Sequence, residues 1–172
     1  MESDIPRQIA FAAAETALAD RFGIPADALI PLLFSLRYGG DWSYASGDVT
    51  AISAVKKTTV YDDESRTGYS LEEIYLFTNP VLLDREGTVH RLEKCGEVPA
   101  RLLVERPYRV RLGADRVIRM TVNPLEREIR TEELEVAEMT FSGSTPYGID
   151  HELEHLAGRE IAGEGLWVFR FG

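Results

Sequence analysis

The pattern of apolar and polar positions predicts two helices near the amino terminus. Apolar residues dominate a stretch over 6–22, and Gly23 follows it as a stop signal. A second helix is predicted over 26–37, where a glycine pair follows the apolar run. Pro31 lies inside this second segment, so we expect a kink or a helix start near it, because proline has no backbone N–H.

The middle of the chain is rich in β-branched and aromatic residues, which is typical of strands. A polar stretch from Asp62 to Gly68 divides the first strand from the second. The segment 126–139 fits either an exposed acidic helix or a twisted edge strand, and we favour the strand. In this part of the chain the first and second predicted strands span 49–61 and 73–83, and two more span 101–112 and 116–122.

The last helix is the most clearly marked element. Residues 142–145 offer N-cap side chains, and Pro146 suits a first helical turn. We expect this helix to end at Gly163 and a closing strand to follow over 166–171. Helices, then strands, then one helix predict an α+β fold, with mixed or antiparallel strands around the C-terminal helix. A length of 172 residues predicts one domain over 1–172.

Composition narrows the classes of partner. The net charge of −10 argues against binding a nucleic-acid backbone or an anionic membrane. No window holds the roughly 20 apolar residues of a membrane span, and the amino terminus lacks the basic region of a signal peptide. We therefore expect a cytoplasmic protein without nucleic-acid or membrane partners. Its single cysteine, Cys95, is a buried small residue, a nucleophile or a metal ligand.

The last predicted helix contains a His-Glu-x-x-His pattern from His151 to His155. Residues four apart lie on one helix face, so both imidazoles can reach one metal ion. Glu152 is then placed to take a proton from the bound water as the general acid/base. The competing interpretation is two surface histidines on a charged helix. Leu153 and Leu156 argue against this second interpretation, because apolar residues at these positions predict a half-buried helix.

A catalytic metal site usually has a third protein ligand. In one class of zinc proteases a third histidine lies six residues after the second, but Ile161 occupies that position. Too few residues follow His155 to form a later helix with a glutamate ligand. The third ligand must come from upstream, where Cys95 and His90 are the candidates. Cys95 is favoured, because a thiolate binds Fe(II) or Zn(II) strongly and Gly96 allows a close backbone approach.

Three segments resemble peptide deformylase, in the order of that family. NPVLLDREGTVHRLEKCGEVP (79–99) is similar to its Asn-Pro strand running into a Glu-Gly-Cys-Leu-Ser motif. LLVERPYRVRL (102–112) is similar to the Arg-containing strand that follows. IDHELEHLAGREI (149–161) is similar to its Gln-His-Glu-x-Asp-His-Leu-x-Gly motif. The resemblance spans about half of the chain.

The resemblance implies one divalent ion held by Cys95, His151 and His155, either Fe(II) or Zn(II), with nickel or cobalt also compatible. It implies that Glu152 is the general acid/base and that the backbone N–H of Gly96 donates to the oxyanion. The implied reaction is hydrolysis of the N-formyl group of a peptide or small molecule. This makes the chain a metal-dependent amidohydrolase that acts on a formamide or amide C–N bond.

The same resemblance implies roles for three further residues. Glu93 pairs with Arg106, and Arg101 faces the substrate channel. Asp150 and Glu154 stand where the family has glutamine and aspartate. Both are expected to support the site or to be solvated, rather than to bind the metal.

The chain departs from the family in its first motif, Gly-x-Gly-x-Ala-Ala-x-Gln. The best counterpart is 47–54, where Ala54 replaces the glutamine that helps to hold the oxyanion. Losing one such donor costs on the order of 10²–10³ in rate. Ser53 or a water is the available substitute. Lys94 replaces a glycine beside Cys95, where a cation can act on the thiolate, bind an acidic substrate or simply be solvated.

The sequence therefore predicts a divergent peptide deformylase that acts on N-formylmethionyl or another N-formyl substrate. One alternative is a catalytically impaired, deformylase-like protein that binds a metal or a partner. A metalloprotease with an upstream third ligand is a further alternative.

Overall fold

The computed structural model describes residues 11–95 and 99–172. Within them the chain folds as α+β, with antiparallel strands and α3 near the carboxyl end. In chain order the elements are α1 (Ala13–Phe22), η1 (Ala26–Leu29), α2 (Ile30–Tyr38), β1 (Trp42–Ser46), β2 (Val49–Asp62), β3 (Thr67–Thr78), β4 (Val81–Glu86), β5 (Val89–Glu93), β6 (Leu102–Arg106), β7 (Arg109–Gly113), β8 (Arg116–Asn123), β9 (Glu128–Leu134), β10 (Glu138–Ser142), α3 (Thr145–Leu156), β11 (Glu164–Gly165) and the 3₁₀ turn η2 (Leu166–Val168).

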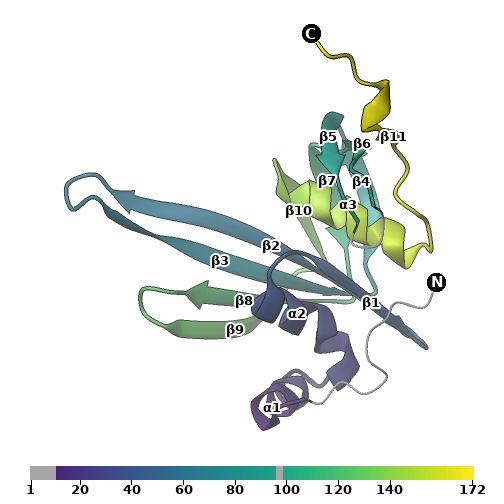
Figure 1. Cartoon of the computed structure of the whole chain (residues 1–172). Coiled ribbons are helices and arrows are strands. Elements are labelled where there is room, and N and C mark those ends of the chain that lie inside the picture. Colours follow the sequence, from purple (N-terminus) through teal and green to yellow (C-terminus); the bar gives the residue numbers. More distant parts are fainter. Residues whose placement is uncertain (1–10, 96–98) are drawn as a thin grey trace.

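A five-stranded antiparallel sheet, in the order β1-β2-β3-β8-β9, forms the centre of the fold. Its strands β2 and β3 make a long hairpin that projects beyond the rest of the molecule (Figure 1). Because successive side chains of a strand face opposite sides of the sheet, each of these strands contributes to two cores. In the paired positions, Ile52 lies opposite Phe77 and Val55 opposite Ile74.

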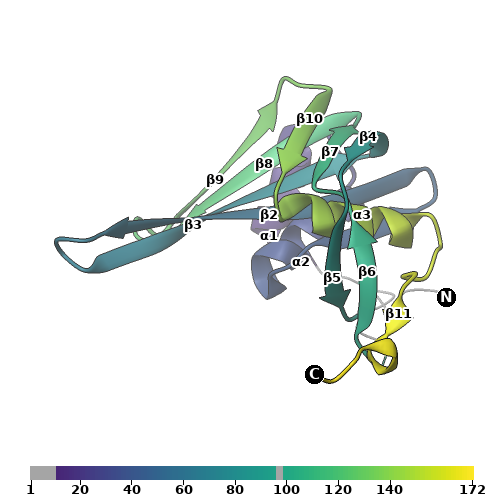
Figure 2. The ribbon, with the colours of Figure 1, turned by 90° about the horizontal axis from the view of Figure 1, so that it is seen from above.

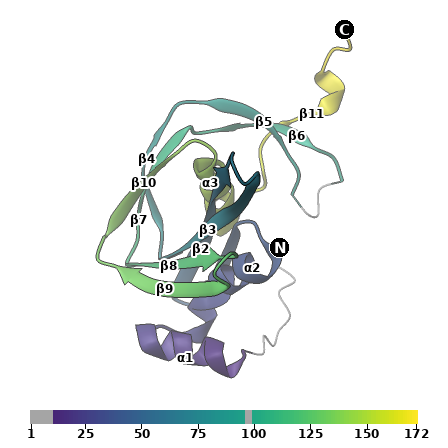
Figure 3. The ribbon, with the colours of Figure 1, turned by 90° about the vertical axis from the view of Figure 1, so that its left-hand side faces the viewer.

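The two faces of this sheet are covered by different helices. Helices α1 and α2 lie on one side and α3 on the other (Figure 3). The buried core on the first side comprises Ala19, Phe22, Leu29, Leu32, Leu33, Ala51, Ile74, Leu76, Ile118 and Met120. The core on the α3 side comprises Ile52, Ala54, Tyr75, Phe77, Val110, Leu112, Val117, Phe141 and Ile149.

Two small sheets stand over α3, in the orders β10-β7-β4 and β11-β6-β5. The chain passes from one small sheet to the other twice, at Gly87 between β4 and β5 and at Pro107 between β6 and β7. Glycine suits the first corner, where φ is 76°. Figure 2 shows the paired strands β5 and β6 passing next to α3, roughly across its direction. This crossing brings the end of β5 next to the helix that carries the two histidines.

Most predicted elements are confirmed, with changes at their ends. The second predicted helix is a short 3₁₀ turn, η1, followed by α2, and α2 begins near Pro31 as expected. The predicted strand over 73–83 is divided at Asn79, whose φ is positive, and the strand over 101–112 is divided at Pro107. The segment 126–139 forms strands β9 and β10, as favoured. Strands β1 and β5 were not predicted.

Two predicted boundaries are wrong. Helix α3 ends at Leu156 rather than at Gly163, because Gly158 takes a left-handed conformation with a φ of 68°. The chain after it is then free to pair with β6. The closing strand is the two-residue β11, ahead of the predicted 166–171, where Trp167 is 91% exposed. Residues 6–10 of the first predicted helix lie outside the described residues, and α1 begins at Ala13.

No helix in the described part of the chain is both long enough and apolar enough to cross a membrane.

Candidate metal centre

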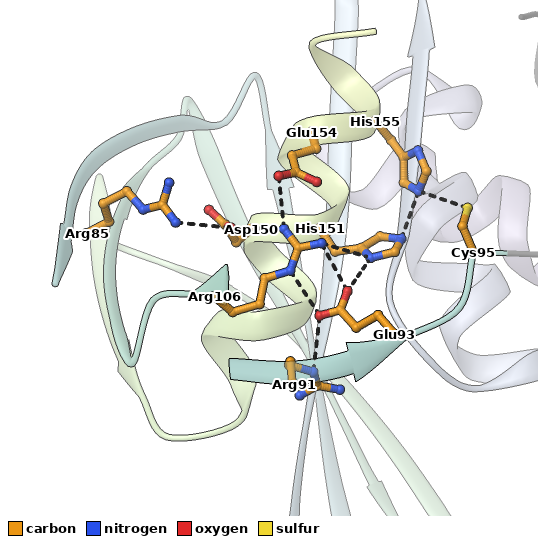
Figure 4. Close-up of polar contacts among 9 residues, drawn as sticks. All are labelled: Arg85, Arg91, Glu93, Cys95, Arg106, Asp150, His151, Glu154 and His155. Atoms are coloured by element: carbon orange, nitrogen blue, oxygen red, sulfur yellow. Dashed lines mark hydrogen bonds and ion pairs between the residues drawn. The ribbon is translucent and has the colours of Figure 1, made fainter. Parts of the chain in front are cut away.

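Cys95, His151 and His155 come together at the end of β5 and on one face of α3. Their ligand atoms all lie within 4.8 Å of one another. The Nε2 atoms of the two histidines are 2.8 Å apart, and the Cys95 Sγ lies 3.7 Å from the His155 Nε2 (Figure 4). The helical spacing of four residues accounts for the histidine pair. The crossing of β5 beside α3 accounts for the cysteine.

The donor set suits a divalent metal ion. The Glu93 carboxylate accepts a hydrogen bond from the His151 Nδ1 at 2.8 Å, so the Nε2 of His151 presents its lone pair to the group. Two imidazole lone pairs facing each other at 2.8 Å repel unless a proton or a cation lies between them. Partial burial, followed by the charge of His151, lowers the pKa of His155 and so favours the neutral ligand form.

Glu152 lies next to the ligands and is nearly buried, with 8% of its surface exposed. Desolvation raises the pKa of its carboxyl to about 7, against the opposing effect of a hydrogen bond from Ser43. A carboxyl group with a pKa near neutral can both accept and return a proton. Glu152 therefore has the burial and the pKa of a general acid/base.

A further carboxyl, that of the half-buried Asp41, faces the same pocket and was not predicted. Its Oδ1 accepts a hydrogen bond from the Val55 N–H at 2.8 Å. Burial raises the pKa of Asp41 to about 6, although that hydrogen bond opposes the shift. A Cβ on Gly148 would collide with the Asp41 carboxylate, so a larger residue at this point of α3 requires that side chain to move. A glycine inside a predicted helix is the one sequence signal that pointed here, because it costs about 1 kcal/mol relative to alanine.

Arg106 connects the acidic side chains that lie next to the candidate ligands. It is only 1% exposed and donates two hydrogen bonds to Glu93, at 2.9 and 3.0 Å, which confirms the expected pairing. It also contacts Asp150 at 3.0 Å and Glu154 at 3.1 Å, so both acids support the site as expected (Figure 4). Burial alone would raise the pKa of Glu93, but His151 and Arg106 hold it at about 2. Glu93 is thus a charged acceptor that fixes the ring of His151.

Two other residues named from the sequence are not brought into this group. His90 pairs with Glu105 on the next strand, at 3.1 Å, rather than with the ligands. Arg101 is exposed in the turn before β6, and its expected place in a substrate channel stays a prediction. Gly96 lies outside the described residues, so its role as an oxyanion donor also stays a prediction.

The expected counterpart of the first motif, 47–54, does not line the pocket. Gly47 forms the turn between β1 and β2, and Ala54 is buried in the core beneath α3. Ser53 is hydrogen-bonded to Ser35 at 2.7 Å and is therefore no substitute for the missing glutamine. Because this segment lies in the β1–β2 hairpin, it does not line the pocket. Residues just before β1 line the pocket instead.

A pocket of about 440 Å³ opens beside the histidines. It lies between the residues before β1, the end of β5 and the first turns of α3. Its lining residues are Gly40, Asp41, Arg91, Leu92, Glu93, Lys94, Tyr147, Gly148, His151 and Glu152.

Comparisons with known proteins give a likeness in structure but none in sequence. No protein-family model matches the sequence, and no curated protein matches it. Among solved structures, the chain is similar to a class I type b peptide deformylase from Acinetobacter baumannii, at 19% identity and a TM-score of 0.45. The match covers 87% of this chain and 80% of that one. A likeness at this level says nothing about activity or substrate.

Proposed function

We propose that this chain is a metal-dependent hydrolase that cleaves a formamide or amide C–N bond. Cys95, His151 and His155 hold one divalent ion, Fe(II) or Zn(II), and Glu152 is the general acid/base. One observation carries the proposal: three ligand atoms converge within 4.8 Å at the edge of a pocket that a buried glutamate also lines. This is the arrangement that metal-assisted hydrolysis requires.

The ion-pair network around Arg106 orients the candidate ligand His151. Arg106 fixes Glu93, and Glu93 fixes the ring of His151 with its Nε2 toward the ion site. A bound divalent ion supplies Lewis-acid activation of a water in such a site. The chain itself supplies the position of the two imidazoles and a carboxyl that exchanges protons.

Glu152 carries the proton through the reaction. It accepts one proton from the attacking water as the new C–O bond forms at the formyl carbon. It returns that proton to the amine nitrogen as the C–N bond breaks. A formamide and one water thereby give formate and a free amine, with no redox step. The raised pKa of Glu152, about 7, matches both halves of this exchange near neutral pH.

The second candidate is a metal- or partner-binding protein with little catalysis. It is favoured by the absence of a glutamine from the described pocket lining; the chain's only glutamine, Gln8, lies outside the described residues. Losing one oxyanion donor lowers the rate on the order of 10²–10³, which is slow but measurable.

Formate release from an N-formylmethionyl peptide separates the two candidates. The protein is prepared anaerobically and loaded with Fe(II), and Glu152→Ala is compared with Glu160→Ala, a change at an exposed glutamate after α3. We expect Glu152→Ala to keep its metal and to lose at least about 100-fold in rate, as expected for loss of a general acid/base. Full activity in Glu152→Ala rules the mechanism out. Metal binding without formate release favours the second candidate, and cleavage of an unformylated peptide favours a protease.

A further inference from the structure

The pocket beside the histidines is charged rather than apolar. Seven of its ten lining residues among the described part of the chain carry an ionisable side chain, Tyr147 included, and Leu92 is the one aliphatic side chain among them. Pockets that bind apolar groups are lined mostly by hydrophobic and aromatic side chains. This lining offers more hydrogen-bond and charge partners to a polar or charged substrate group than an apolar pocket does.

The charges in the pocket are divided between its walls. Asp41 and Glu152 lie on the side of β1 and α3, whereas Arg91 and Lys94 lie on β5 and just beyond it. The remaining acid, Glu93, pairs with both Arg106 and Arg91, and Arg106 is shared with Asp150 and Glu154. On the β5 side, Arg91 is therefore part of the ion-pair network, whereas Lys94 makes no ion pair among the described residues.

Arg91 is held in place but keeps hydrogen-bonding capacity. Its guanidinium lies over the ring of Tyr147, with the Cζ 4.5 Å from the ring centroid. Its Nε lies 3.1 Å from the Glu93 Oε2, yet this buried N–H makes no hydrogen bond among the described residues. The same carboxylate also accepts hydrogen bonds from Arg106 and His151. Glu93 stands between these three partners in Figure 4.

A guanidinium fixed on an aromatic ring and short of acceptors is an anion site. A planar guanidinium can donate two parallel hydrogen bonds to one carboxylate. Because the stacking on Tyr147 already restricts the side chain, less side-chain entropy is lost on binding. We propose that Arg91, with Lys94 beside it, binds a carboxylate on the amine portion of the substrate. This rests on the proposed function and sharpens it: the substrate is an anionic N-formyl compound rather than one with an apolar side chain.

Two isosteric pairs of substrates test the proposal and locate the carboxylate. N-formylglutamate α-amide is compared with N-formylglutamine α-amide for a side-chain carboxylate. Free N-formylmethionine is compared with N-formylmethionine amide for an α-carboxylate. We expect kcat/KM to be about 10- to 100-fold higher for the anionic member of one pair, as expected for a hydrogen-bonded charge pair. Arg91→Gln should remove this preference, so that kcat/KM becomes equal for the two members of that pair.

Arg109→Gln is the matched control, because Arg109 is an exposed cation of β7 that pairs with Glu86 away from the pocket. It should keep the wild-type preference. Glu152-dependent hydrolysis with equal kcat/KM for both members of each pair would overturn the inference and leave the proposed function standing.

Equilibrium binding gives a readout that does not depend on turnover. The same four compounds are titrated into the Zn(II)-loaded Glu152→Gln variant, with and without Arg91→Gln. Tighter binding of an anionic member that is lost with Arg91→Gln supports the inference, even where no compound is hydrolysed and the proposed function fails. Equal affinities for the anionic and neutral members overturn it.

Discussion

The two faces of the central sheet bury very different side chains. Beneath α1 and α2 the buried cluster is apolar, with Leu29 and Leu32 fully covered, and the buried polar pair beside it, Ser35 and Ser53, is uncharged. On the α3 side an apolar cluster of similar size adjoins Arg106, Asp150 and Glu152, all buried. Burying charge costs several kcal/mol per ion unless partners offset it, so the second face is poorly designed for stability alone. The contrast indicates that the first face stabilises the fold and the second one carries chemistry.

The largest effect should come from breaking the buried network. Arg106→Ala leaves Glu93 and Asp150 without their buried partner, so we expect a loss of about 3–5 kcal/mol in the free energy of unfolding. Leu32→Ala, on the other face, should cost a similar 2–5 kcal/mol by creating a cavity. The two variants should differ in metal affinity, which only Arg106→Ala lowers, by about 10- to 100-fold.

Urea unfolding and metal titration in parallel check this contrast. Arg106→Lys, which keeps the charge without the planar fork, should fall between wild type and Arg106→Ala. Equal metal affinities for Arg106→Ala and Leu32→Ala would show that the network does not support the ligands.

A smaller effect should appear in the pH dependence of stability. The pKa of Asp41 is about 6 in the folded protein and about 3.8 when unfolded. Between these values the folded protein keeps a proton that the unfolded chain has lost. The contribution of Asp41 to stability therefore falls as pH rises, and the total loss above pH 6 is roughly 3 kcal/mol.

Asp41→Asn keeps the acceptor for Val55 and removes the titration. In metal-free protein, where no bound cation favours the carboxylate, Asp41→Asn should gain stability over wild type as pH rises from 4 to 6.5. Chemical unfolding at several pH values measures the difference, and Asp63→Asn in the exposed β2–β3 turn is the control. A difference that stays constant with pH, or that changes in the opposite direction, would contradict the burial of Asp41.

The smallest effect concerns the packing of Gly148 against Asp41. Gly148→Ala places a methyl group on the Asp41 Oδ2, so we expect a loss of about 1–3 kcal/mol. In an Asp41→Ala background the same change should stabilise by about 0.5–1 kcal/mol, because alanine favours the helix. A double-mutant cycle by urea unfolding measures this reversal of sign. Additive effects of the two changes would refute the contact.

The parts of the site that depend on local spacing were predictable from the sequence. His151 and His155 share a helix face because four residues make about one turn, and Cys95 followed from its ligand chemistry and place upstream. Asp41 was missed, because its approach to Gly148 joins β1 and α3 across about 100 positions of sequence and depends on their packing.

The errors have physical reasons as well. The segment 47–54 resembled a known motif in its letters, but the register of β1 against β2 turns it into the hairpin and the core. The apolar run 166–171 has the composition of a strand, but β11, just before it, is the part that pairs with β6. Composition predicts a strand, whereas only a neighbouring strand with free backbone groups completes one.

Cobalt substitution tests the central claim most directly, because Co(II) bound to a thiolate gives a sulfur-to-metal charge-transfer absorption. The wild-type protein should bind one Co(II) per chain and show this absorption. Cys95→Ser should lose it and bind the ion more than about 100-fold more weakly, since a lost ligand costs more than a lost outer partner. His90→Ala should match wild type. A wild-type protein that binds Co(II) without the sulfur absorption, or a Cys95→Ser variant that keeps full affinity, would contradict the proposed Cys95–His151–His155 centre.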